Sequence, residues 1–297
     1  MTEWELVVGP RELPLRICEW GPSDGASTGG ATPVDAPPVL ILHGFLEQGA
    51  AWEGVARRLG RRVLAPDHRG HGLSGHVGAG GWYHFWDYVG DVDAIVEHLG
   101  GPVDLVGHSM GGTIACLFAG SRPDRVRKLV LVEGLGPPDA GDDVLVRARQ
   151  YLADRRSPPE HRPMRDLAEA VDRVRKANPS LHEDEARRLV ERTTRSGAPA
   201  GTGTGDGLVW TWDPLHRARM PVPFQASVFV RFLREITAPV LLVDGGRSPW
   251  TLPDAQERMA ALAVSRREVV VRAGHLVHHD APDALARLVR AFLDEIA

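Results

Sequence analysis

The chain has 297 residues, of which 43% are hydrophobic and 25% charged, and this balance excludes a largely disordered protein. Lys and Arg total 35 against 39 Asp and Glu, so the net charge of -4 offers no broad attraction to nucleic acid or membranes, and we expect neither as a partner. Two cysteines, no signal-peptide pattern and no apolar run of membrane-spanning length predict a cytoplasmic protein without a disulfide framework.

Strands and helices are predicted to alternate in the first half of the chain. Two short strands are expected at Glu5–Val8 and Leu15–Trp20, followed by a loose loop over 21–38 that is rich in Gly, Ala, Pro, Ser and Thr. The elements expected next are strand 39–42, strand 62–67, helix 84–99, strand Val103–Val106, helix Met110–Ala119 and strand Val126–Val132. This alternation favours an α/β fold with a parallel sheet covered on both faces.

The pattern changes between about 134 and 236, where the chain is rich in Arg and Glu. Helices are predicted here at roughly 143–156, 164–177 and 182–195, followed by a flexible glycine-rich loop, Gly201–Gly207. Alternation resumes with strand Val240–Val243, helix Pro253–Ala263, strand Glu268–Val271 and a C-terminal helix from Pro282 to Ile296. We therefore predict an α/β core at 1–133 and 237–297, interrupted by a helical cap at 134–236.

The segment GHSMGG at 107–112 lies between a predicted strand and a predicted helix. A nucleophilic serine must stand at the apex of a sharp, strained turn, and the glycines on either side leave room for that turn. The N–H groups at the start of the following helix would stabilise developing negative charge. Ser109 is therefore the candidate nucleophile.

Two further segments carry groups that a serine nucleophile needs. His275 follows a predicted strand, and an imidazole is matched to removing the proton of a hydroxyl near neutral pH. His43, Gly44 and Phe45 follow an earlier strand, and an amide of this loop can pair with the amide of the residue after the nucleophile. We expect the N–H groups of Phe45 and Met110 to form an oxyanion hole for a tetrahedral intermediate.

Two polar segments beside these candidates are interpreted as structural. His278 and His279 lack a convincing set of partner ligands in the sequence, so we expect no metal there. Asp280 is interpreted as the N-cap of the helix that begins at Pro282. The segment 67–74, DHRGHGLS, is interpreted as a tight turn held by its polar side chains.

The motifs His-Gly-Phe, Asp-x-Arg-Gly-His-Gly-x-Ser, Gly-His-Ser-Met-Gly-Gly and Gly-His occur in this order within 43–120 and 239–290. In this order they resemble the α/β-hydrolase superfamily, and most closely the serine hydrolase-like proteins. The resemblance implies a mostly parallel central sheet covered by helices on both faces, a Ser–His–acid triad under a helical cap, and no cofactor. The serine at position 109 argues against the haloalkane dehalogenase and epoxide hydrolase branches, where relatives use an Asp.

The acid of the triad departs from the pattern of many relatives. In those proteins the strand near 240 is followed by Gly-x-x-Asp, and the matching position here is Ser248. Two carboxylates end strands in the required order, Glu133 and Asp244. Some superfamily members place their acid at the first position, and the longer side chain suits the extra reach, so we favour Glu133. Asp244 is kept as the alternative, and the absence of a competent acid is a third reading.

Aromatic side chains around the cap suggest what the site accepts. Apolar rings with few charges suit an acyl chain or an aromatic ester. The predicted substrate-binding residues are Trp82, Trp86, Trp210, Trp212, His43, Gly44 and Leu276.

We therefore predict a metal-free serine esterase that hydrolyses a small-molecule ester through an acyl-enzyme. A thioesterase, lactonase, amidase or C–C bond hydrolase would use the same constellation of groups. The serine at 248 also leaves open a hydrolase-fold sensor that binds a small molecule with little turnover. The sequence carries no signal for a particular oligomeric state.

Overall fold

The computed structural model describes residues 1–9, 12–21, 36–139, 144–197 and 207–295. Its centre is one eight-stranded sheet in the order β1-β2-β4-β3-β5-β6-β9-β10. The strands are β1 (Thr2–Val8), β2 (Leu13–Trp20), β3 (Val39–Leu42), β4 (Val63–Pro66), β5 (Val103–His108), β6 (Val126–Val132), β9 (Val240–Gly245) and β10 (Ser265–Val270). β2 pairs antiparallel with β1 and with β4, and every other pair is parallel, so the predicted α/β fold is confirmed.

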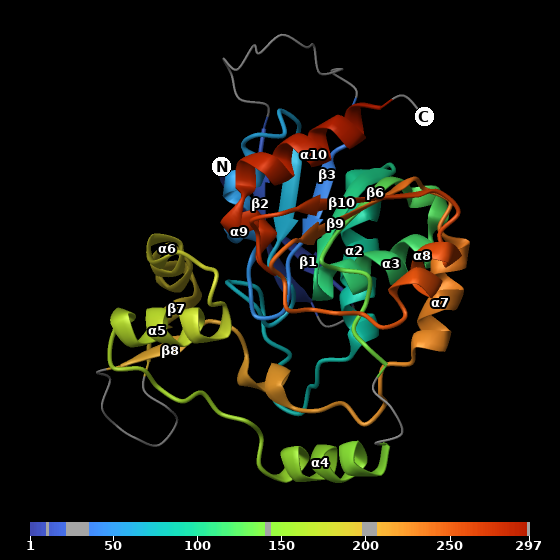
Figure 1. Ribbon diagram of the computed structural model, residues 1–297. Coiled ribbons are helices and arrows are strands. Elements are labelled where there is room, and N and C mark those ends of the chain that lie inside the picture. The colour runs from blue at the N-terminus through green and yellow to red at the C-terminus, as the bar shows by residue number, and fades with distance from the viewer. Residues whose placement is uncertain (10–11, 22–35, 140–143, 198–206, 296–297) are drawn as a thin grey trace.

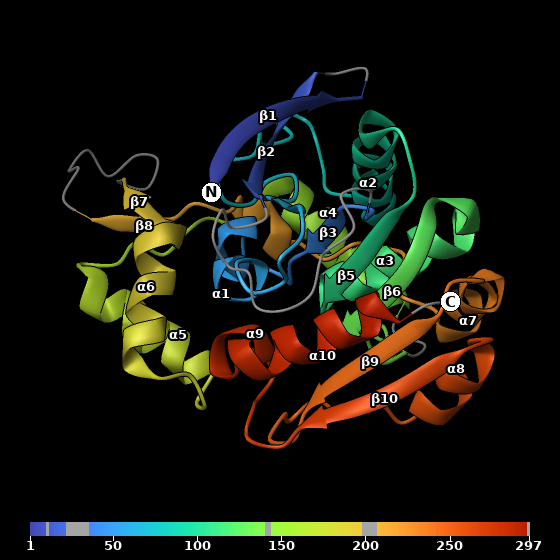
Figure 2. The same ribbon diagram turned by 90° about the horizontal axis from the view of Figure 1, so that it is seen from above.

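Helices cover both faces of the sheet (Figures 1 and 2). One face carries α1 (Glu53–Ala56), α9 (Val277–Asp280) and α10 (Pro282–Asp294), and the other carries α2 (Phe85–Leu99), α3 (Met110–Ser121), α7 (Ala226–Glu235) and α8 (Ala255–Ala261). Strand β3 shows why the strands read as continuous apolar runs. Its Val39 and Ile41 pack on the first face and its Leu40 and Leu42 on the second, so all four are fully buried.

The stretch between β6 and β9 contains α4 (Val144–Arg156), α5 (Leu167–Ala177), α6 (Glu183–Thr193) and the short antiparallel pair β7 (Thr194–Ser196) and β8 (Leu208–Trp210). Helices α5 and α6 share a small apolar core of their own, and α4 lies apart from the sheet (Figure 1). The β7–β8 pair and α7 were not predicted. Helix α7 packs against α3 in the main core, because the backbone of Phe232 closely approaches Gly120.

Some predicted boundaries differ from the observed ones. The helix expected at 164–177 begins at Leu167, because Met164 pairs with Leu208 as an isolated bridge. Asp280 is not an N-cap: its carboxylate accepts hydrogen bonds from Gly274 N and Ser180 Oγ, and α10 begins without a side-chain cap. The expected loop at 21–38 and the glycine-rich run at 201–207 lie mostly outside the described residues.

Three short 3₁₀ helices complete the described elements: η1 (Gly49–Trp52), η2 (Pro123–Arg125) and η3 (Pro214–Arg217). Within the described ranges, no helix combines the length and the apolar character that crossing a bilayer requires.

Candidate active site

Ser109 occupies the sharp turn between β5 and α3. Its backbone has φ 49° and ψ -114°, a conformation that L-residues rarely adopt. The turn depends on small neighbours: a Cβ at Gly111 would lie 2.2 Å from the carbonyl oxygen of Leu42, and one at Gly107 would lie 2.6 Å from that of Gly111. The strand therefore passes into the helix within one residue, and this places the Ser109 hydroxyl at the carboxyl edge of the sheet.

Three side chains from different loops form a hydrogen-bonded row at this edge. Ser109 Oγ lies 3.1 Å from His275 Nε2, and His275 Nδ1 lies 3.0 Å from Glu133 Oε2. Ser109 follows β5, Glu133 follows β6 and His275 lies in the loop after β10. The structure thus brings together the nucleophile, the base and the favoured acid of the sequence analysis.

Glu133 is held by more than His275. It has a left-handed backbone conformation, φ 51°, and its carboxylate also accepts hydrogen bonds from Gly245 N at 2.7 Å and from Ser248 Oγ at 2.5 Å. Burial by itself would raise the pKa of Glu133, but the hydrogen bonds from His275, Ser248 and Gly245 together hold that pKa below its ordinary value. The side chain is therefore ionised at neutral pH and suited to stabilising an imidazolium.

The alternative acid, Asp244, is engaged elsewhere. Its carboxylate forms an ion pair with Arg267 on the neighbouring strand β10, with Nε and Oδ2 2.5 Å apart. Glu133, not Asp244, is the carboxylate that contacts His275.

The amides proposed for an oxyanion hole are those of Phe45 and Met110. Met110 is the first residue of α3, where a backbone N–H has no acceptor within the helix. Among the described residues, neither amide donates to another protein group. A hydrogen bond within the loop that carries Phe45 holds it in place, because Gly44 N donates to Glu47 Oε2 at 2.7 Å.

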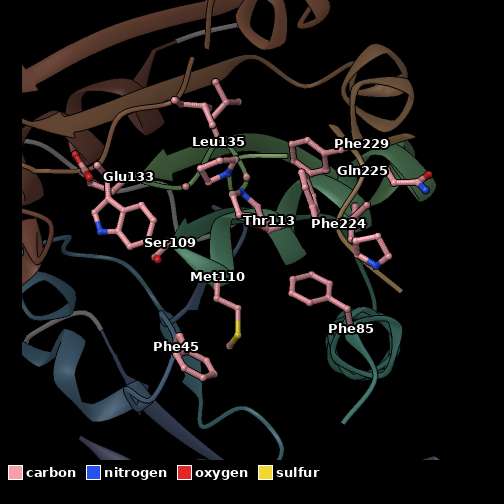
Figure 3. A pocket seen from close by; sticks show the side chains of 18 of the residues that line it. Phe45, Phe85, Ser109, Met110, Thr113, Glu133, Leu135, Phe224, Gln225 and Phe229 are labelled. Atoms are coloured by element: carbon pink, nitrogen blue, oxygen red, sulfur yellow. The ribbon is translucent and has the colours of Figure 1, made fainter. Parts of the chain in front are cut away.

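A cavity of about 1320 Å³ opens beside the Ser109 hydroxyl. Figure 3 shows Ser109, Glu133, Met110 and Phe45 toward one end of it and the rings of Phe85, Phe224 and Phe229 toward the other. Most of the lining is apolar and comes from α2, α3, α7, α8 and the loops between them. A volume of this size suits a substrate with a bulky apolar part.

Two of the predicted substrate-binding residues, Trp82 and Trp86, line this cavity. Trp250 also lines it, and its ring centroid lies 5.4 Å from that of His275. Trp250 and the apolar residues of α7 were missed by the sequence analysis. The spacing of Val228, Phe229 and Phe232 is a helical apolar pattern that could have indicated α7.

The other five predicted substrate-binding residues lie outside the cavity lining, and all of them except the half-buried Trp210 are buried. His43 is fully buried, and its Nε2 accepts a hydrogen bond from His68 N at 2.9 Å. Gly44 is buried within the loop that carries Phe45. Trp210 and Trp212 stack on one another with centroids 6.4 Å apart, and Leu276 packs into the small core of α5 and α6.

The segment 67–74 forms the structural turn that the sequence analysis predicted. It also anchors the chain around Asp213 and η3, which borders the cavity. Asp67 is fully buried and accepts hydrogen bonds from Gly49 N at 2.7 Å and Leu73 N at 2.9 Å. Asp213 N, just before η3, donates to Gly70 O at 2.7 Å, and Tyr83 Oη donates to Asp213 Oδ2 at 2.8 Å. These bonds hold the segment before η3 against the turn at 67–74.

A family model for the alpha/beta hydrolase fold matches residues 37–282. Among curated proteins, a serine hydrolase-like protein of Danio rerio is 29% identical over 294 residues, which cover 94% of this chain and 85% of the relative. Serine hydrolase-like protein 2 of Homo sapiens is 26% identical, with 95% of this chain and 93% of the relative covered. Among solved structures, a thioesterase domain from the curacin biosynthetic pathway has a TM-score of 0.79 and 32% identity, with 97% of this chain and 99% of that chain covered.

Proposed function

The chain belongs to the α/β-hydrolase fold family, and we propose that it is a serine hydrolase that cleaves carboxylic esters through an acyl-enzyme. One observation carries the proposal: the row Ser109–His275–Glu133, with 3.1 Å and 3.0 Å between successive partners, borders a large apolar cavity. The relatives named serine hydrolase-like support the same class of chemistry.

The first step uses the two hydrogen bonds of His275. With Glu133 ionised, the ring proton belongs on Nδ1, so that the lone pair of Nε2 faces the Ser109 hydroxyl. Ser109 Oγ attacks the ester carbonyl carbon while Nε2 takes its proton, and Glu133 stabilises the resulting imidazolium. The negative charge that develops on the carbonyl oxygen is bound by the amides of Phe45 and Met110. Losing one such donor typically costs about 3–4 kcal/mol of transition-state stabilisation.

The second half of the reaction returns the enzyme to its starting state. The C–O bond to the alcohol breaks, and His275 Nε2 gives its proton to the leaving oxygen. Water then attacks the acyl carbon while the same nitrogen removes a water proton, and Ser109 leaves with a proton restored. The apolar lining of the cavity suits an acyl chain or aromatic group attached to the reacting carbonyl.

A fluorophosphonate probe tests the nucleophile directly. Wild-type protein is expected to be labelled and Ser109→Ala is not, while Ser121→Ala, which changes a serine at the far end of α3, serves as a matched control that stays labelled. Labelling that survives the Ser109 change would overturn the proposal.

Thioester hydrolysis is a second candidate, favoured by the similarity to the curacin thioesterase domain over 97% of this chain. Ester and thioester substrates with the same acyl chain separate the two functions. A higher kcat/KM for the p-nitrophenyl ester supports the esterase, and a higher value for the matching N-acetylcysteamine thioester supports the thioesterase. Both require Ser109.

A further inference from the structure

Three side chains next to the candidate active site form a cluster that the proposed reaction does not use. Glu47, His278 and His279 each bring a potential ligand atom within 4.8 Å of the other two. Glu47 lies in the loop after β3, two residues beyond Phe45. The two histidines belong to α9, three and four residues after His275. Glu47 and His278 are buried, and His279 is partly buried.

The cluster holds buried polar atoms without partners. Glu47 Oε1, both ring nitrogens of His278 and Nε2 of His279 form no hydrogen bond within the part of the chain that the structure describes. His278 Nε2 and Glu47 Oε1 approach to 3.3 Å without forming one. A buried polar group without a partner is destabilising, so such groups are rare in native proteins. Unpartnered atoms on three neighbouring side chains indicate a group that completes them.

The surrounding contacts hold these side chains in place. Glu47 Oε2 is already used, because it accepts from Gly44 N at 2.7 Å and faces His108 Nδ1 at 3.0 Å, which leaves Oε1 free. The His278 ring stacks on Trp52 with centroids 4.4 Å apart and planes 3° from parallel.

His279 has a partner on helix α6. Its Nδ1 lies 3.8 Å from Glu185 Oε2 on α6, and a carboxylate behind one ring nitrogen is a common support for a histidine whose other nitrogen binds a metal.

The chemistry of the three side chains also suits ligation. One carboxylate and two imidazoles are ligands that zinc-class cations accept.

We propose that Glu47, His278 and His279 form a binding site for a borderline-soft divalent cation of the Zn²⁺ class. Metal–ligand bonds of about 2.1 Å span at most roughly 4.2 Å between two ligand atoms, so small side-chain movements suffice to close the site around an ion. A bound ion would tie the loop that carries the oxyanion amide of Phe45 to α9, and Glu185 would extend the tie to α6. The site is independent of the proposed ester hydrolysis, because none of its three ligands belongs to the Ser109 row.

Cobalt(II) provides a readout that does not depend on activity. Tag-free protein is stripped with a chelator and titrated with Co²⁺, while visible absorption and tryptophan fluorescence are recorded. We expect one equivalent to bind with the absorption of a four-coordinate ion and to quench fluorescence through Trp52, and we expect Zn²⁺ to displace it and to raise the Tm. Ser109→Ala is expected to bind Co²⁺ like the wild type. Metal binding can therefore be tested independently of the proposed ester hydrolysis.

Variants test which residues bind the metal ion. His279→Gln, at a partly buried position, is expected to bind Co²⁺ at least tenfold more weakly, and Glu185→Gln about tenfold more weakly through loss of the supporting carboxylate. His98→Gln, on α2 at the other face of the sheet, is the matched control and is expected to bind as the wild type does. Absence of stoichiometric binding by the wild type, or binding that is unchanged in folded His279→Gln and Glu47→Gln, would overturn the proposal.

Discussion

Ser248 Oγ donates a hydrogen bond of 2.5 Å to the carboxylate of Glu133. Ser248 occupies the position where many α/β hydrolases carry the acid of their triad, and here it supports an acid that comes from β6 instead. With this arrangement one carboxylate, that of Glu133, lies beside His275. The hydrogen bond from Ser248 favours the ionised form of Glu133. The serine at 248 is therefore compatible with the proposed triad.

Replacing Glu133 by Gln is expected to lower kcat on a p-nitrophenyl ester by roughly 10³–10⁴-fold, with little change in KM. An amide can orient His275 in the wrong tautomer and cannot stabilise the imidazolium. Asp244→Asn is the matched control and should retain activity within about twofold, since Asp244 contacts Arg267 rather than His275. Steady-state kinetics check both, and a larger loss in Asp244→Asn would assign the acid to that residue.

Ser248→Ala is expected to lower stability in a pH-dependent way. The pKa of Glu133 in the folded protein lies below its ordinary value, so its contribution to stability is present above the unfolded pKa and is lost as the pH falls through the folded pKa. Removing one donor weakens that contribution. Urea unfolding should therefore show a smaller free energy of unfolding for the variant at neutral pH, and a smaller difference between the two proteins at about pH 3. A difference that is equal at both pH values would contradict this account.

Gly111→Ala is expected to destabilise the fold by more than about 2 kcal/mol, because its Cβ would lie 2.2 Å from the carbonyl oxygen of Leu42. Gly90→Ala is the matched control. Gly90 lies in α2 with no atom within 4 Å of an added Cβ, so this change should stabilise the protein by about 0.5–1 kcal/mol. Urea denaturation measures both, and equal effects would show that the close approach at Gly111 is relieved without cost.

Phe85→Asp is expected to change chain-length preference without harming the fold. Phe85 is the first residue of α2, where an acidic side chain is favourable, and it lines the cavity away from Ser109 (Figure 3). A charge there disfavours a long acyl chain, so kcat/KM should fall about tenfold for a decanoate ester and stay within about twofold for an acetate ester. A uniform loss across the series would mean that long chains bind elsewhere.

The sequence by itself determined the elements whose signals are local. Alternating apolar strands and helices indicated the parallel sheet, because the apolar periodicity of a strand or helix can be recognised from residues that are close in the sequence. The GHSMGG segment indicated the turn at Ser109 for a similar reason, since only small residues allow that backbone to pass so closely to β3. His275 and the two candidate acids, Glu133 and Asp244, could be named from their positions at or after strand ends and from the resemblance to α/β hydrolases.

Only the tertiary structure decided between residues with the same local signal. Glu133 follows β6 and Asp244 lies near the end of the adjacent parallel strand β9, but the left-handed turn at Glu133 brings its carboxylate to His275 while Arg267 pairs with Asp244. A tryptophan is equally apolar in a cavity wall and in a packed interior, so the sequence could not separate Trp82 from Trp212. The cluster of Glu47 with His278 and His279 joins segments far apart in the chain, and such contacts depend on how whole elements pack rather than on the pattern within any one of them.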